Sequence, residues 1–285
     1  MREGVSLSLS EKCFSEFVNL IYQLTGITIG SNRISLVEGR LRRRVLSLHY
    51  QSYEEYLEYV CTHKNEQVEF INLMTTNETY FFRTPRVWDY IEKIFLPQWI
   101  LQHPDKKLTA WSAAASSGEE AHSLGVICQS FRDQNQKFNY QILGTDISTE
   151  MIELCQKGEY SGRSIEAFKK TRPEQFLKYM KSISNAQFQA HSDIRSRLKF
   201  QTHNLFSPLS SNEVFDLILI RNVLIYFKTS DQEKVLEVIQ PKLAHDGLLV
   251  IGESESLSYI KSSFKSIEPL LYCHKQAEEM GSKAG

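Results

Sequence analysis

From about residue 91 onward, short apolar runs alternate with amphipathic segments, and this alternation constrains the fold more than any other feature. The apolar runs occupy 108–113, 140–147, 215–222 and 247–254. Helical spacing follows them in 119–131, 149–158 and 230–243. An almost continuous apolar run such as FDLILI is typical of a strand that is buried on both faces. The alternation predicts a doubly wound α/β domain with a mostly parallel sheet over 91–285.

Residues 1–90 follow a different pattern. Apolar side chains recur at the three-to-four spacing of an amphipathic helix, first around Phe14, Phe17 and Ile21, and again from Ile34 to Leu48. Gly26 and Gly30 punctuate the gap between these two stretches, and further helical segments follow without any strand pattern. We therefore expect an all-helical domain over 1–90.

The segment 157–200 is polar and rich in Ser and Lys, unlike its neighbours. It ends in the alternating run RLKFQTHNL, so we expect an insertion with a small structural element of its own.

Composition excludes several classes of protein. With 33 Lys and Arg against 34 Asp and Glu, the net charge of −1 argues against binding nucleic acid through a basic surface. Five scattered cysteines without a C-x-x-C pair predict neither a disulfide framework nor a zinc site. No apolar run approaches the ~20 residues of a membrane helix, and the N-terminus has no signal-peptide pattern. We expect a cytoplasmic protein without a metal and without membrane insertion.

The first candidate site is the loop WSAAASSGEE after the first predicted strand, at 111–120. Its small residues would let the backbone approach a ligand closely. Only Gly118 is a glycine, and Glu119 and Glu120 stand where a dinucleotide fold would seat phosphate oxygens. Two carboxylates there would repel a phosphate and suit a cationic or hydroxyl-rich ligand. A tight strand–helix junction without any ligand is the alternative.

The second candidate is Asp146, at the end of the second predicted strand. An acidic residue in this place accepts hydrogen bonds from ribose hydroxyls in nucleotide-binding folds. Alternatively, Asp146 or Ser148 only caps the following helix. A ribose-binding acid without a phosphate cradle favours S-adenosylmethionine over NAD, because S-adenosylmethionine carries a ribose and a sulfonium cation but no phosphate.

Three blocks carry a resemblance to a known family. TNETYFFR at 76–83, the loop at 111–120 and RNVLIYF at 221–227 together resemble the chemotaxis receptor methyltransferases, known as CheR. The resemblance covers nearly the whole chain, including GESE at 252–255. It implies an N-terminal helical domain and an S-adenosylmethionine-binding domain with an inserted β-subdomain. It also implies methyl transfer to glutamate side chains on cytoplasmic helices of chemoreceptors, with S-adenosylhomocysteine as the other product.

Site residues follow from the matching positions. The implied cofactor contacts are Asn77, Thr79, Arg83, Glu120, Asp146, Asn204, Leu205, Arg221 and Asn222. Arg83 and Tyr226 would lie nearest the transferred methyl group. We hypothesise that the Arg83 guanidinium orients the substrate carboxylate and that Tyr226 donates a hydrogen bond. One departure from the family is that Glu253 stands where family members usually carry a histidine. A contact that the family makes through this histidine therefore cannot be carried over to this chain.

The predicted helix over 33–48 is rich in arginine, with four arginines between residues 40 and 44. In the family, arginines on this helix read the receptor around the methylated glutamates, which implies Arg40 and Arg43 as substrate-recognition residues. Leu46 stands where a further arginine is common. A merely solvated basic face is the alternative.

Two other functions stay open. One is a catalytically silent S-adenosylmethionine-binding module that signals by docking on a chemosensory partner. The other is a methyltransferase of the same fold with another carboxylate or small-molecule substrate. We expect a monomer, and the inserted subdomain could bind a tether peptide at the receptor C-terminus, as it does in some family members.

Overall fold

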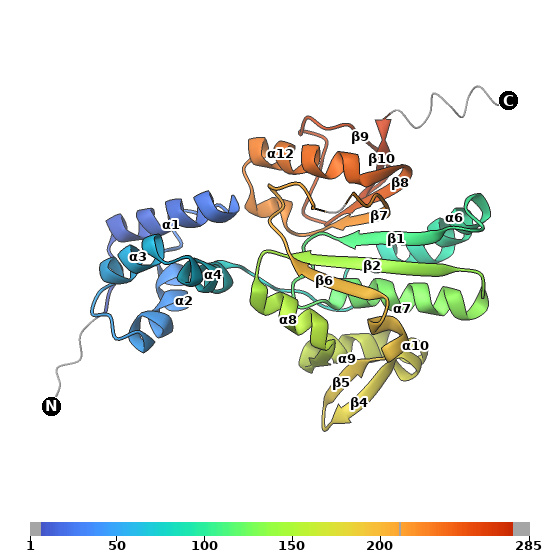
Figure 1. Cartoon of the computed structure of the whole chain (residues 1–285), viewed down its shortest axis with the longest axis horizontal. Helices are drawn as coiled ribbons and strands as arrows, with labels where there is room; N and C mark the ends of the chain where they lie inside the picture. Colours follow the sequence, from blue (N-terminus) through green and yellow to red (C-terminus); the bar gives the residue numbers. More distant parts are fainter. Residues whose placement is uncertain (1–6, 211, 276–285) are drawn as a thin grey trace.

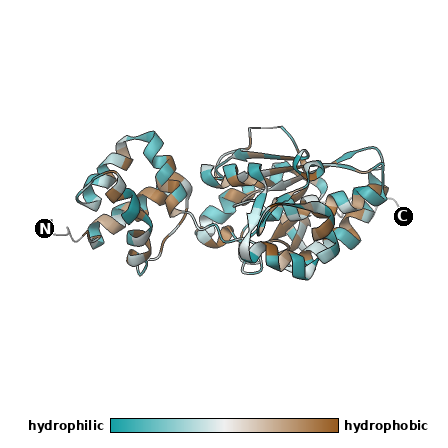
Figure 2. Cartoon of the chain, turned by 90° about the horizontal axis from the view of Figure 1, so that it is seen from below, coloured by the Kyte–Doolittle hydropathy of each residue, from teal (hydrophilic) through white to brown (hydrophobic). Residues whose placement is uncertain are grey.

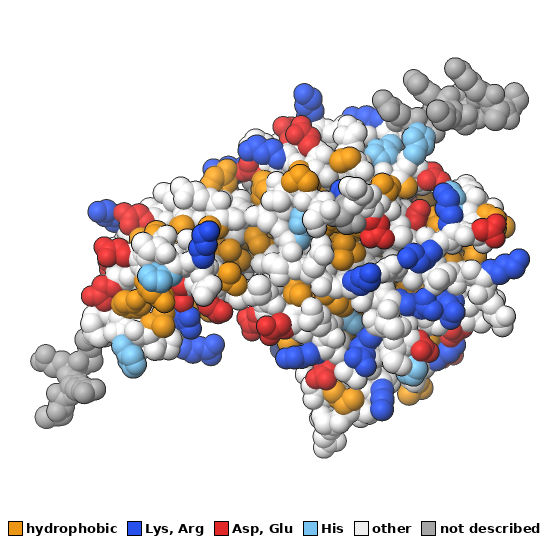
Figure 3. Space-filling view, in the orientation of Figure 1, with side chains coloured by type: hydrophobic (Ala, Val, Ile, Leu, Met, Phe, Trp, Pro, Cys, Tyr) orange, Lys and Arg blue, Asp and Glu red, His pale blue; other side chains and the backbone are white. Residues whose placement is uncertain are grey.

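The computed structural model describes residues 7–210 and 212–275, which form a small helical bundle beside a larger α/β body (Figure 1). Each part has its own hydrophobic core. Seen from a second direction, the helices of both parts carry hydrophilic and hydrophobic residues together, as amphipathic helices do (Figure 2). On the face drawn in Figure 3, positive and negative side chains are interspersed, consistent with the near-zero net charge.

Four helices make the bundle: α1 Glu11–Thr25, α2 Ile34–Ser47, α3 Tyr53–Thr62 and α4 Lys64–Met74. The Ser10 side chain caps α1 by accepting from the Cys13 N–H. At the other end α1 stops at Gly26, whose φ of 73° is left-handed. Phe17, Ile21 and the α2 residue Val37 are fully buried between the helices.

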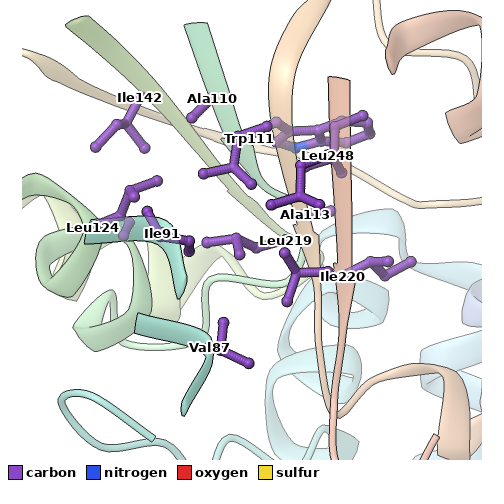
Figure 4. Close-up of a cluster of buried hydrophobic side chains, with 14 of the residues drawn as sticks. Val87, Ile91, Ala110, Trp111, Ala113, Leu124, Ile142, Leu219, Ile220 and Leu248 are labelled. Carbon is purple, nitrogen blue, oxygen red and sulfur yellow. The ribbon is translucent and has the colours of Figure 1, made fainter. Parts of the chain in front are cut away.

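The next helices belong to the larger body. They are α5 Pro85–Tyr90, the π-helical turn η1 Ile91–Phe95 and α6 Leu96–Gln102. Val87 and Ile91 lie in one apolar cluster with Ala110, Leu124 and Leu219, from the sheet and a covering helix (Figure 4). Helix α5 thus precedes the predicted domain boundary at residue 90 and packs on the α/β core rather than on the bundle.

The main sheet has the order β6-β2-β1-β7-β8-β10-β9. Its strands are β1 Lys107–Ser112, β2 Asn139–Asp146, β6 Leu198–Thr202, β7 Phe215–Ile220, β8 Leu243–Ile251, β9 Phe264–Glu268 and β10 Leu271–His274. The connecting helices are α7 Glu119–Gln134, α8 Thr149–Lys157 and α12 Thr229–Ile239, with short 3-10 turns η2 Leu224–Tyr226 and η3 Gln240–Lys242. The first five strands in that order pair in parallel, which confirms the expected doubly wound, mostly parallel sheet.

The direction of strand addition reverses between β1 and β7. In an open α/β sheet this switch point opens a crevice at the carboxyl ends of the strands, where ligands bind. The sequence did not predict the antiparallel hairpin of β9 and β10, which extends the sheet beyond β8.

The insertion carries its own antiparallel sheet, of order β3-β5-β4. Its elements are β3 Glu159–Ser161, α9 Gly162–Thr171, α10 Pro173–Tyr179, β4 Met180–Ser184, β5 Gln187–Ala190 and α11 Ser192–Arg195. The run RLKFQTHNL lies outside it, contrary to expectation, because β6 pairs in parallel with β2 in the main sheet. Its alternation reflects an edge strand, with Leu198 buried and Lys199 exposed. Within the described ranges, no helix is both long and apolar enough to cross a membrane.

Candidate active site

A cavity of about 680 Å³ lies at the carboxyl ends of β1, β2 and β7, at the switch point of the sheet. Its walls come from the α/β body, from the bundle between Thr25 and Arg40, and from the connecting segment 74–83. All nine predicted cofactor residues line this cavity, as do Tyr226 and Arg40. Arg43 does not line it. Blocks that are far apart in the sequence thus converge on one space.

The loop after β1 needs small residues. Ser116 and Gly118 adopt positive φ values of 50° and 98°. A Cβ at Gly118 would lie 2.8 Å from the Tyr160 hydroxyl and 3.0 Å from the Cys155 sulfur. Burial lowers the pKa of His122 to about 4, and this neutral imidazole contacts Tyr160 beneath the loop (2.7 Å). His122 therefore supports the loop by packing, which keeps the backbone at the cavity wall.

Asp146 is buried and fixes the same loop. Its Oδ2 accepts from the Ser116 N–H (2.8 Å) and its Oδ1 from the Ser148 N–H (3.0 Å). A carboxylate has about four acceptor positions, so capacity remains for ligand hydroxyls. The helix-capping role falls to Ser148, whose side chain accepts from the Met151 N–H at the start of α8. Burial raises the pKa of Asp146, while the backbone N–H groups oppose that rise.

Glu120 and Arg221 form a buried ion pair in the cavity wall. Arg221 Nη1 donates to Glu120 Oε2 (3.0 Å), and Ser112 Oγ donates to Glu120 Oε1 (2.8 Å). Arg221 Nη2 donates to the Arg83 carbonyl (2.9 Å) and to Thr84 Oγ1 (2.8 Å). Burial raises the pKa of Glu120, and the charge of Arg221 opposes that rise. Arg221 therefore ties the end of β7 to α7 and to the segment that carries Arg83.

Arg83 and Tyr226 are far apart in the sequence, and both line the cavity. Arg83 Nη1 donates to the Glu78 carbonyl at 3.3 Å, and the guanidinium lies 5.6 Å from the centre of the Tyr80 ring. Its other N–H groups have no hydrogen-bond partner among the described residues, so they are available to a carboxylate. The Tyr226 carbonyl accepts from both the N–H and the hydroxyl of Thr28, each at 2.8 Å.

The remaining predicted residues differ in whether their polar groups already have hydrogen-bond partners within the protein. Asn204 Nδ2 donates to the Leu24 carbonyl (3.1 Å), so this side chain also holds the end of α1. Leu205 is buried and supplies an apolar wall. Asn77 accepts from Ser116 Oγ through its carbonyl (2.9 Å). Thr79 lines the cavity, as does Asn222 with a left-handed φ of 58°.

Sequence reasoning missed the contribution of the segment between α1 and α2. Ile27, Thr28, Ile29 and Gly30 line the cavity, although the pattern suggested only a break between two helices. The signal was the alternation ITI between Gly26 and Gly30, which indicates extended backbone rather than a simple turn.

The arginines of α2 separate into two groups. Arg40 is half-buried and donates to the Met74 carbonyl and to Thr76 Oγ1 (2.7 Å), and burial lowers its pKa. Arg44 donates twice to the buried Glu66, at 2.8 and 2.6 Å. Arg43 is exposed, with no hydrogen-bond or ion-pair partner in the described part of the chain. Arg44 is thus paired within the protein and Arg40 lines the cavity, whereas Arg43 faces solvent.

The donor set of this cavity fits S-adenosylmethionine. Asp146 offers free acceptor positions to ribose hydroxyls, and Leu205 with Ile147 offers an apolar wall to a base. The carboxylates of Glu120 and Asp146 disfavour phosphate and are compatible with a sulfonium cation. Among the residues that the structure describes, no group of three or more His, Cys, Asp or Glu side chains could hold a metal ion.

Fold and cavity together define a class: an α/β domain whose strand ends bind a cationic, ribose-bearing cofactor, closed on one side by a helical bundle. Comparison with known proteins agrees. The family "CheR methyltransferase, SAM binding domain" matches residues 77–272, and "CheR methyltransferase, all-alpha domain" matches 12–75. The chain belongs to the CheR methyltransferase family and is an S-adenosylmethionine-dependent methyltransferase, which confirms the expected resemblance.

Curated relatives extend over most of the chain. It is 30% identical over 262 residues to "Chemotaxis protein methyltransferase Cher2" of Pseudomonas putida, covering 90% of this chain and 94% of the relative. It is also 30% identical over 270 residues to "Chemotaxis protein methyltransferase 1" of Pseudomonas aeruginosa, covering 92% and 96%. A relative from Borreliella burgdorferi with the name "Chemotaxis protein methyltransferase" is 27% identical over 263 residues.

Proposed function

We propose that this protein transfers the methyl group of S-adenosylmethionine to glutamate side chains on cytoplasmic helices of chemoreceptors, for sensory adaptation. The products would be glutamate 5-O-methyl ester and S-adenosylhomocysteine. The observation that carries the proposal is that Arg83, Arg40, Tyr226 and the ribose-type acid Asp146 line one cavity. Relatives that carry the name "Chemotaxis protein methyltransferase" support a protein of chemotaxis as the substrate.

The reaction requires alignment of the two reactants and does not require a proton transfer. A glutamate carboxylate, with a reference pKa of about 4.3, is already ionised near neutral pH, so no general base is needed. When bound, S-adenosylmethionine supplies an electrophilic methyl group: a carboxylate oxygen forms the new C–O bond while the methyl–sulfur bond breaks, and its electron pair stays on sulfur. Alignment of reactants can lower such a barrier by about 7–11 kcal/mol.

Different residues would position the substrate, the cofactor and the receptor helix. The unoccupied N–H groups of Arg83 would hold the second oxygen of the substrate carboxylate in a planar fork. Tyr226 would donate a hydrogen bond to the same carboxylate or to the methyl donor. Asp146, Asn77, Thr79, Asn204, Leu205 and Asn222 would hold the cofactor, with Glu120 and Arg221 completing that wall. Arg40 at the cavity and Arg43 outside it would meet the acidic receptor helix.

A labelled methyl-transfer assay on receptor-rich membranes tests the proposal, with calorimetry for S-adenosylmethionine binding. We expect base-labile label in the receptor. Tyr226→Phe should slow transfer about tenfold, the effect of one lost hydrogen bond of ~1.4 kcal/mol. Arg83→Ala should slow it by about ten- to a hundredfold, since bonds to charged groups are stronger. Normal rates in both variants, with cofactor binding intact, would contradict these roles.

The same experiment separates the alternatives. Cofactor binding without any methyl ester on receptors would favour a catalytically silent signalling module. Ester formation on small carboxylic acids but not on receptors would favour a same-fold methyltransferase with another substrate. The free donors of Arg83 favour an enzyme, because a silent module has no use for an unpaired guanidinium at the cavity.

A further inference from the structure

The carboxylate of Glu255 is buried behind the cavity and gathers an unusual set of donors. Its Oε1 accepts from the N–H groups of Val223 and Leu224, both at 2.8 Å. Its Oε2 accepts from the N–H of Asn222 at 2.9 Å and from that of Gly252. One carboxylate therefore satisfies three consecutive backbone donors of the turn after β7 and ties them to the turn after β8.

This turn needs such support. Asn222 has a left-handed φ of 58°, which non-glycine residues adopt infrequently. The N–H groups of residues 222–224 turn away from the β7 ladder, and buried N–H groups without acceptors are costly. A neutral acceptor could not satisfy four donors at once, whereas an ionised carboxylate has about four acceptor positions.

The turn also leads directly to Tyr226. Residues 222–224 connect β7 to η2, and η2 carries Tyr226 to the cavity. The carbonyl of Tyr226 is fixed from the bundle side by Thr28. Glu255 holds the beginning of this short segment and Thr28 holds its end, so the Tyr226 side chain has little freedom to move.

We propose that Glu255 is a positioning residue for methyl transfer, which places Tyr226 by fixing the backbone of residues 222–224. The role of Tyr226 rests on the proposed function above, whereas the hold of Glu255 on the turn does not. Neighbouring Glu253, which replaces the usual histidine of the family, is exposed and has no hydrogen-bond or ion-pair partner within the described ranges. In this loop it is Glu255, and not Glu253, that accepts the hydrogen bonds from the turn after β7.

Glu255→Gln is the informative change, with Glu253→Gln as its matched control. A glutamine side chain keeps the size but turns one oxygen into an NH2 group, which would face two of the four N–H donors. At saturating cofactor and receptor, we expect kcat to fall about tenfold, as when the Tyr226 hydroxyl is lost. In a Tyr226→Phe background the same change should lower kcat by at most about twofold, because both act through one group.

Hydrogen exchange of residues 222–226 gives a readout without turnover. Glu255→Gln should speed exchange there by about tenfold or more, while Glu253→Gln leaves it unchanged. Gly252→Ala provides a second variant if Glu255→Gln folds poorly, because its Cβ would lie 2.7 Å from both Asn222 N and Glu255 Oε2. It should give the same non-additive pattern with Tyr226→Phe.

Additive losses of kcat in the double variant, or equal exchange in the two Gln variants, would overturn the proposal. A wild-type enzyme that methylates no receptor would overturn the proposed function instead. In that case the exchange measurement still decides whether Glu255 holds the turn.

Discussion

Arg221 donates to Glu120, to the Arg83 carbonyl and to Thr84, so most of its hydrogen-bonding capacity is used within the protein. The resemblance carried by RNVLIYF implies Arg221 as a cofactor contact, and Arg221 lines the cavity. The pattern could not reveal its partners, because they come from two other elements. At the residue scale, sequence thus predicts which side chains reach the site more readily than which of them stay free for a ligand.

Arg221→Met should destabilise the protein by about 3–5 kcal/mol, because it leaves the buried Glu120 carboxylate without its cation. Urea unfolding of the purified protein measures this loss. Arg43→Met is the control: replacing an exposed arginine that pairs with none of the described residues should change stability by no more than about 0.5 kcal/mol. Equal midpoints and slopes for wild type and Arg221→Met would contradict the account of this ion pair.

At the scale of the element, α2 shows both the strength and the limit of periodicity. Its buried face of Val37, Leu41 and Val45 follows the predicted apolar stripe. The stripe could not show that Arg44 pairs with Glu66, because that partner lies on α4. Nor could it show that Arg40 turns to the backbone of the connecting segment, because that segment has no periodicity to read.

The two arginines assigned to substrate recognition should therefore behave differently. Arg43→Ala should raise the KM for receptor at low salt and flatten its salt dependence, since an exposed charge acts through screened, long-range attraction. Arg40→Ala should lower kcat at every salt concentration, because Arg40 lines the cavity.

Arg42→Ala is the control, because Arg42 is exposed but pairs with Glu38 and donates to the Leu7 carbonyl, and it should leave the salt slope unchanged. An unchanged salt slope in Arg43→Ala would mean that the exposed arginine is only solvated.

At the scale of the whole molecule, the active site depends on contacts between the two bodies. Thr28 meets Tyr226 across 198 positions of sequence, Asn204 meets Leu24 across 180, and Tyr22 donates to Asp231 across 209. These contacts close the cavity on the bundle side. Neither body contains the complete site, so we infer that the bundle is part of the catalytic machinery as well as of receptor recognition.

The fold was predictable where burial imposes a strong pattern. The run of β7 and the second half of β8, residues 247–251, lie in the interior of the sheet and are almost uniformly apolar. The strands at the two edges of the sheet could not be assigned to it from the sequence. The strands β9 and β10 form an edge hairpin with a mixed pattern, and β6 is an edge strand next to a polar insertion. Near the predicted boundary at residue 90, α5 has a buried and an exposed face like the bundle helices, so its periodicity does not show which body it packs on.

Incubation of the protein with labelled S-adenosylmethionine and a cytoplasmic receptor fragment, followed by peptide mass spectrometry, tests the central claim most directly. The account predicts base-labile methyl groups on glutamate side chains of the receptor helices, formed about tenfold more slowly by Tyr226→Phe. Methyl groups on other side chains, or none on the receptor while the cofactor binds, would contradict it.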